Sequence, residues 1–297
     1  MVEAAANGRL KDQAKTLATV LFLIAGGLIS LVFGEGWVRI GGTAIGFVVA
    51  LGIFVQYSGT VQRVVLEGEA LRVDLGFGLR RVALPLSELS EITLGSPDGT
   101  VADVAVLRFG GSQILMSPAF FPAARALVTQ LIGKVTLGVE VPLRAGPARL
   151  MGFQRFGQEE LNSSLSYSMP SGAATIYVYL RSSPLEGDLQ APEAVEHFAL
   201  VDEDMRGATS ARYPQLQFAA EPSAEETVGG VPFRWSRIAS QNPGPGLESF
   251  VGLAVIGAYY LKVRCTAEKG KPARAEVRSL LTVLAPKLAA GARQSAS

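Results

Sequence analysis

The sequence predicts an α+β protein in which a two-helix transmembrane hairpin precedes two domains rich in antiparallel strands. Two observations carry most of this prediction. Two long apolar runs lie near the N-terminus with only Gly34-Glu35-Gly36 between them. From Val61 onward, short segments alternate between apolar and polar residues, and each series of such segments ends in a stretch with helical spacing. Alternation with a period of two is typical of half-buried strands, whereas apolar residues three and four apart are typical of helices.

The two apolar runs predict two membrane-spanning helices, over residues 17–34 and 37–57. At 1.5 Å per residue they rise about 27 and about 31 Å, close to the roughly 30 Å of bilayer hydrocarbon. Arg39 is the only charged residue in either run, and it lies near the start of the second, where its side chain reaches the interface. A cleaved signal peptide fits less well because a second apolar run follows. Two buried helices of a soluble protein also fit less well, because neither run has a polar face.

Small residues four positions apart predict close helix packing within or between hairpins. Gly26 and Ser30 form such a pair in the first run, and Gly42 and Gly46 form another in the second. The alternative is that these glycines reflect the general frequency of glycine in membrane helices. The pairs are therefore candidate packing positions, compatible with a homo-oligomer.

Basic residues flank both ends of the hairpin and set its expected orientation. Arg9, Lys11 and Lys15 precede the first run, and several arginines follow the second. The positive-inside rule then places both ends in the cytoplasm. The expected location is a bacterial inner (plasma) membrane, with the protein multi-pass, residues 1–16 forming a cytoplasmic tail and the soluble domains facing the cytoplasm.

Residues 61–133 predict an antiparallel β-barrel or sandwich capped by a C-terminal helix. Residues 71–75 alternate, a glycine-containing turn follows, and residues 80–86 alternate again, before helical spacing appears over 120–131. The stretches 66–73, 81–89 and 110–115, placed after a membrane hairpin, resemble bacterial pleckstrin-homology-like domains of small membrane proteins. The resemblance covers about residues 17–133 and implies a PH-like fold without a catalytic signature.

The same resemblance raises the question of lipid binding. In eukaryotic relatives of the fold, a basic loop between the first two strands holds inositol phosphates, but here that turn is Glu67-Gly68-Glu69, which would repel them. Arg80 and Arg81 are candidates for contacting anionic lipid headgroups instead. The alternative is that both are ordinary solvent-facing strand residues.

Residues 134–149 predict a linker, and residues 150–290 a second α+β sandwich domain followed by a disordered tail over 291–297. The second domain is expected to contain two strands, a helix that begins at Pro192 and ends near Arg206, four strands, and a final helix from Pro272 that Pro286 kinks or ends. The stretches 174–179 and 259–266 resemble the PsbP/DcrB-type α/β/α sandwich of small bacterial proteins. Members of that class are mostly binding or assembly factors, which implies a role without catalysis.

The composition argues against several kinds of chemistry. The net charge is +1, which does not favour a nucleic-acid partner. The single histidine, His197, is expected within a helix, on the surface or at the boundary of the core, paired with Glu193, and the single cysteine, Cys265, is expected to be a buried strand residue. We expect no catalytic residues, no cofactor and no metal site, since neither a nucleotide-binding glycine motif nor a metal-ligand cluster occurs in the sequence.

These observations predict a non-enzymatic integral inner-membrane protein whose tethered domains act as a scaffold for a protein partner at the lipid bilayer. One alternative is an accessory subunit of a membrane secretion or transport complex. A second alternative is a membrane-bound enzyme, which a deep pocket lined by His197 or Cys265 would favour.

Overall fold

The computed structural model describes residues 3–5, 61–75, 80–95, 104–116, 123–156, 163–180, 189–241 and 246–295. The chain divides into two compact units. The first unit comprises Met1–Glu88 and Ser112–Leu127, and the second comprises Leu89–Gly111 and Val128–Ser297.

The first unit contains a four-stranded antiparallel sheet with the strand order β1-β2-β3-β4. Val64, Leu71 and Val73 are buried in it, in keeping with the alternation of the sequence. Gly68 has φ +56 in the tight turn between the second and third strands, a conformation that glycine adopts without strain. The elements are β1 (Glu3–Ala5), β2 (Val61–Glu67), β3 (Ala70–Leu75), β4 (Arg80–Pro85), the short 3₁₀ helix η1 (Leu86–Glu88), β7 (Ser112–Met116) and the start of α3 (Ala124–Val135).

The second unit is built on one large antiparallel sheet with the strand order β12-β14-β15-β16-β11-β10-β9-β5-β6, in which β13 also pairs with β14 and β8 with β9. Two long helices, α4 (Pro192–Arg212) and α5 (Ala273–Ser295), complete it. The strands are β5 (Leu89–Gly95), β6 (Val104–Phe109), β8 (Arg144–Ala145), β9 (Ala148–Arg155), β10 (Ser163–Met169), β11 (Gly172–Leu180), β12 (Phe218–Ala220), β13 (Ala224–Val228), β14 (Val231–Ser240), β15 (Leu247–Ile256) and β16 (Tyr259–Glu268).

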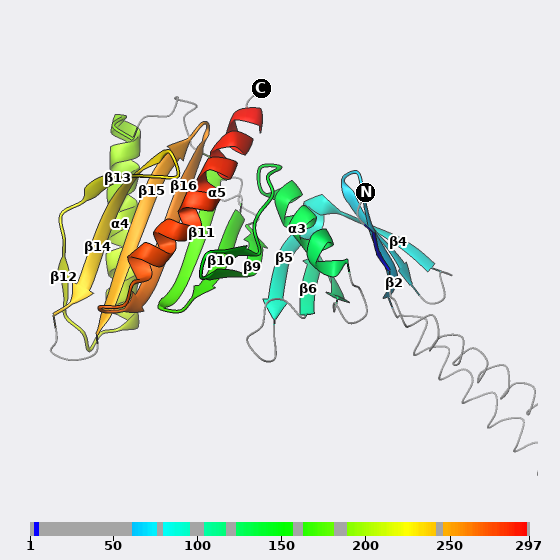
Figure 1. The fold of residues 1–297 in the computed structure, drawn as a ribbon, viewed down its shortest axis with the longest axis horizontal. Helices are drawn as coiled ribbons and strands as arrows, with labels where there is room; N and C mark the ends of the chain where they lie inside the picture. The colour runs from blue at the N-terminus through cyan, green and yellow to red at the C-terminus, as the bar shows by residue number, and fades with distance from the viewer. Residues whose placement is uncertain are drawn as a thin grey trace, which may run out of the picture. The chain divides into compact units, whose positions relative to one another are not determined.

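The sheet of the second unit is covered by α4 on one face and by α5 on the other (Figure 1). Leu253 and Val255 of β15 pack with Phe198 of α4 in one buried cluster, and Val251 packs with Met205 of α4 in another. Successive residues of a strand point to opposite faces. Residues 248–256 of β15 are all buried, because both faces of this strand are covered.

The structure corrects the predicted fold class. The described residues are mostly antiparallel sheet, and strands assigned to two separate domains share one sheet, because Ile92 of β5 pairs with Phe153 of β9. Both side chains are fully buried or nearly so, and their burial explains the pairing. The stretch expected as a linker, 134–149, contains β8 and the first two residues of β9.

The two C-terminal helices are longer than predicted. The helix α4 extends six residues beyond Arg206, and α5 continues through Pro286 to Ser295. Residues 291–295 of the expected disordered tail are therefore helical. Burial of Leu284, Leu288 and Ala292 against the sheet explains why the proline does not end the helix.

The prediction of an integral membrane protein is also corrected. None of the helices α3, α4 and α5 in the described ranges is long and apolar enough to cross a membrane. The first has only 12 residues, and the other two, with 21 and 23, carry charged residues along their length. The expected spans 17–34 and 37–57 lie outside the described residues. The inner-membrane location with cytoplasmic domains and the membrane-bound scaffold, subunit and enzyme are therefore wrong, whereas the bilayer as a partner stays a prediction.

Candidate ligand-binding site

The α4-facing side of the sheet carries an unusual set of polar residues beside the helix. Paired residues of antiparallel strands share a face, and Lys262 of β16 pairs with Leu253, which packs under α4. Lys262 therefore lies on this side of the sheet, and so does Arg264, two residues further along the strand. Tyr177 of β11 pairs with Lys262 and extends the same surface. Since α4 packs on β14 and β15, the strands β16 and β11 lie beside the helix.

A pocket of about 840 Å³ opens at the C-terminal end of this surface. It lies between the end of α4, the turn from β10 to β11, and the strands β11 and β16. Its volume falls within the range typical of small-molecule sites. The polar residues that matter for its chemistry are Ser171, Thr175, Tyr177, Thr209, Arg212, Tyr213, Arg264, Thr266 and Glu268.

Two arginines dominate the charge of the pocket. Arg212 lies exposed in the last turn of α4, and Arg264 is half-buried in β16. Within the described ranges, neither has an ion-pair partner. The one acidic lining residue, Glu268, lies 3.5 Å from the Lys271 ammonium, which offsets its charge. The pocket is therefore positively charged.

Buried hydrogen bonds hold two walls of the pocket in place. The backbone N–H and hydroxyl of Ser171 donate to the Glu276 carboxylate at 3.1 and 3.0 Å, which ties the β10–β11 turn to the first turn of α5. Thr209 of α4 donates to Ser249 at 3.4 Å, and the Ser249 and Thr266 oxygens are 2.8 Å apart. This chain connects the end of α4 to β16. The hydroxyls of Ser171, Thr209 and Thr266 thus have internal partners.

An aromatic cluster lies on the same face, toward the start of α4. The Tyr179 hydroxyl is 2.6 Å from Nε2 of His197, and the Tyr260 ring stacks on the imidazole with 4.3 Å between centroids. Burial chiefly lowers the pKa of His197, and the nearby Lys262 ammonium adds to the effect. Burial also raises the pKa of Tyr179. The tyrosine therefore keeps its proton and the imidazole stays neutral, with a hydrogen bond between them.

Lys262 connects the aromatic cluster to the pocket. Its ammonium lies 4.9 Å from the centre of the Tyr177 ring and 6.0 Å from that of Tyr179, in cation–π geometry. Burial lowers the pKa of Lys262, an effect that the Asp204 carboxylate opposes and the charge of Arg264 reinforces. Because Tyr177 also lines the pocket, Lys262 borders it.

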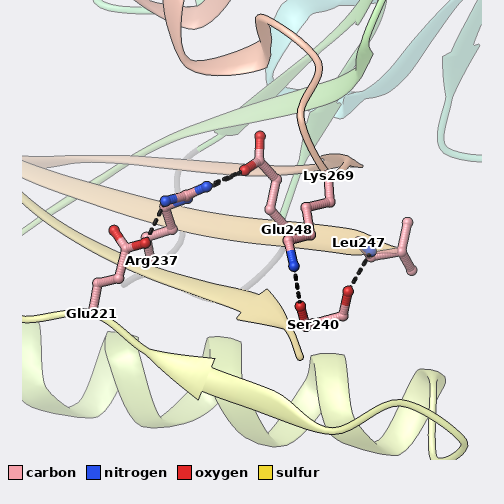
Figure 2. Close-up of polar contacts among 6 residues, drawn as sticks. All are labelled: Glu221, Arg237, Ser240, Leu247, Glu248 and Lys269. Atoms are coloured by element: carbon pink, nitrogen blue, oxygen red, sulfur yellow. Dashed lines mark hydrogen bonds and ion pairs between the residues drawn. The ribbon is translucent and has the colours of Figure 1, made fainter. Parts of the chain in front are cut away.

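A second polar cluster lies near the β14–β15 connection (Figure 2). Arg237 donates to the buried Glu248 carboxylate at 2.6 and 3.2 Å and also pairs with Glu221. Nearby, the Lys269 ammonium donates to the Ser240 carbonyl at 2.6 Å, and the Ser240 hydroxyl accepts from the Leu247 N–H. These groups satisfy one another, so the cluster is structural.

The predicted site residues fall in different places. Cys265 is buried, which confirms that prediction. His197 lies at the edge of the core as predicted, but its close partner is Tyr179. Arg80 and Arg81 are exposed in β4, where Arg81 donates to Asp74 at 3.0 Å. The packing candidates Gly26, Ser30, Gly42 and Gly46 lie outside the described residues.

Arg212, Lys262 and Arg264 were not predicted as site residues from the sequence. A signal for the last two was present, because cationic residues at alternate positions of an otherwise buried strand must share one face. No cluster of three metal-ligating side chains occurs among the residues that the structure describes.

No family model matches the chain, and no curated protein matches it at a significant level. The resemblances to pleckstrin-homology-like domains and to the PsbP/DcrB-type sandwich therefore remain predictions.

Proposed function

We propose that the second unit is a non-enzymatic binding module that takes an anionic ligand in the pocket beside α4. One observation carries the proposal: Arg212 and Arg264 both line the pocket, and neither has an ion-pair partner in the described part of the chain. Guanidinium groups match carboxylate and phosphate oxygens with paired hydrogen bonds. An anion placed between them would complete the hydrogen bonding of both.

The composition of the pocket supports binding over catalysis. Its serine and two of its threonines are engaged in hydrogen bonds to other side chains, and the Ser171 partner is a carboxylate held in the core. His197 and Cys265, the residues that would have favoured an enzyme, are not among the lining residues. The Glu276 carboxylate accepts from both the hydroxyl and the backbone N–H of Ser171, which fits a structural role for this serine better than that of an activated nucleophile.

The test uses the full chain, labelled with ¹⁵N, and inorganic phosphate as the probe. We expect phosphate to shift the side-chain N–H signals of Arg212 and Arg264 at millimolar concentration. Arg264→Gln should weaken this binding about tenfold, because a charge-assisted hydrogen bond contributes roughly 1.5–3 kcal/mol. Arg293→Gln is the matched control: it removes the same charge at an exposed position in the last turn of α5.

Two outcomes would overturn the proposal. In the first, the arginine signals do not respond to phosphate. In the second, Arg264→Gln and Arg293→Gln weaken binding equally, which would show that phosphate responds only to net charge.

A further inference from the structure

The spacing of charges along β16 suggests the shape of the ligand. Lys262 and Arg264 lie two residues apart on the same face of the strand. With a rise of about 3.3 Å per residue, their attachment points are about 6.6 Å apart. A small anion held between Arg264 and Arg212 would leave the Lys262 ammonium without a partner from the ligand.

Lys262 is held in a fixed place for a second contact. Its ammonium is positioned over Tyr177 and Tyr179, and the side chain is half-buried. In the described ranges it has no ion-pair partner, although Asp204 is near enough to act on it. A positioned, partly desolvated cation at the rim of a positively charged pocket favours a second anionic group on the same ligand.

The same strand also limits how far the positive surface extends. Glu268 lies on the same face, four residues beyond Arg264, and lines the opposite end of the pocket. On β16 the positive charge of this face is therefore limited to Lys262 and Arg264, and Arg212 of α4 adds a third positive charge. This arrangement suits two anionic groups rather than a long polyanion.

We infer that the ligand is an extended acidic peptide segment of a partner protein, in which one residue separates two acidic residues. This inference rests on the proposed anion site. Side chains at positions i and i+2 of an extended peptide lie on one side and repeat every 6.6 to 6.8 Å, which matches the spacing of Lys262 and Arg264. One carboxylate lies between Arg264 and Arg212. The other lies at Lys262, above the ring of Tyr177.

The experiment compares two fluorescein-labelled peptides of identical composition with the full-length protein. One has the sequence Gly-Thr-Asp-Thr-Asp-Thr-Gly, and its isomer Gly-Thr-Asp-Asp-Thr-Thr-Gly places the two carboxylates on opposite sides of an extended chain. We expect the first to bind about tenfold more tightly in fluorescence anisotropy, because only its carboxylates reach both cations together.

Three variants test whether Lys262 causes the preference for the first peptide over its isomer. Lys262→Gln should abolish the preference and should weaken phosphate binding far less than Arg264→Gln does. Lys262→Arg keeps the charge and should retain the preference, which also shows that changes at this position are compatible with folding. Arg293→Gln should alter neither measurement.

The possible failures are distinguishable. Equal binding of the two peptides with an intact phosphate response would overturn the peptide inference and leave the anion site standing. A preference that survives Lys262→Gln would likewise overturn the peptide inference alone. A protein that fails to respond to phosphate and to both peptides would overturn the inference and the proposed function together.

Discussion

The hydroxyl of Tyr179 lies 2.6 Å from Nε2 of His197, while the ring of Tyr260 stacks on the same imidazole. Burial lowers the pKa of His197 and raises that of Tyr179, so both groups are driven toward their neutral forms. A hydrogen bond therefore joins a neutral phenol to a neutral imidazole. His197 of α4 thus helps to hold the helix on the sheet through Tyr179 and Tyr260, next to the proposed binding surface.

A first prediction concerns the titration of His197. Its pKa should lie below 6.5 in the folded protein, and Tyr179→Phe should raise it, because the variant removes a hydrogen bond to the neutral imidazole. The chain contains one histidine, so its ring signals in an NMR titration need no assignment. Tyr259→Phe, on the neighbouring residue of Tyr260 and therefore on the opposite face, is the control and should leave the pKa unchanged. A folded-state pKa at or above 6.5 would contradict the prediction.

A second prediction links this titration to stability. Since the folded pKa is lowered, the unfolded chain binds a proton first as the pH falls. The contribution of His197 to stability should be complete above its unfolded pKa of about 6.5 and be lost as the pH falls from there through the folded pKa. Urea unfolding between pH 7.5 and about 5 measures the slope of the free energy of unfolding against pH. His197→Gln should reduce it, and an equal slope in both proteins would count against the account.

The sequence predicted most strands because alternation alone marks them. Residues 71–75 and 80–85 form β3 and β4, and the expected strand at 259–266 lies within β16. Periodicity does not reveal which strands pair, and so it missed that Ile92 lies opposite Phe153 from a distant part of the chain. These two paired strands lie on either side of the boundary predicted between the two domains.

The candidate site was harder to predict than the strands. The alternate positions of Lys262 and Arg264 are visible in the sequence, but whether the two residues lie at a binding site depends on where α4 packs on the sheet. Arg212 joins them only because α4 extends six residues beyond its predicted end at Arg206. A site formed by the end of a helix and two central strands can be recognised only once the tertiary structure is known.

A third prediction concerns the ion pair between Arg237 and Glu248. The Glu248 side chain is 6% exposed and that of Arg237 is 33% exposed. Arg237→Met leaves a buried carboxylate without its partner and should destabilise the fold by about 2 kcal/mol, less than the 3–5 typical of fully buried pairs. Urea denaturation measures the change.

The double variant Arg237→Met/Glu248→Leu is the decisive comparison for this pair. It removes both charges and should recover stability to within about 1 kcal/mol of the unaltered protein. Lys271→Met breaks the exposed pair with Glu268 and should cost less than about 0.5 kcal/mol. A double variant less stable than Arg237→Met would show that the charge on Glu248 has another stabilising partner.

A fourth prediction concerns Gly252 of β15, which faces Trp235 of β14. A Cβ atom at this glycine would lie 2.6 Å from the indole ring, well inside van der Waals contact. Gly252→Ala should therefore destabilise the fold by about 1–3 kcal/mol and change the tryptophan fluorescence. In α4, a Cβ at Gly207 would meet open space, so Gly207→Ala should stabilise the fold by up to about 1 kcal/mol. Equal effects of the two substitutions would contradict the packing at Trp235.

A fifth prediction concerns the reactivity of Cys265. Burial, assisted by the charges of Glu248 and Glu276, raises the pKa of this thiol to about 12, and the residue is 1% exposed. Because the thiolate is the reactive form, iodoacetamide should modify the folded protein very slowly at pH 8 and the urea-unfolded protein readily. Since Cys265 is the only cysteine, mass spectrometry reads its modification directly.

The matched control for Cys265 moves the thiol to the surface. Ser168→Cys in a Cys265→Ala background places it at an exposed position of β10 and should restore rapid modification in the folded state. Cys265 alternates with Arg264 and Thr266, so its side chain points away from the α4 face. Cys265→Ala should therefore preserve the phosphate response of Arg264. Rapid labelling of Cys265 in the folded protein would show that β16 opens far more readily than its central place in the sheet implies.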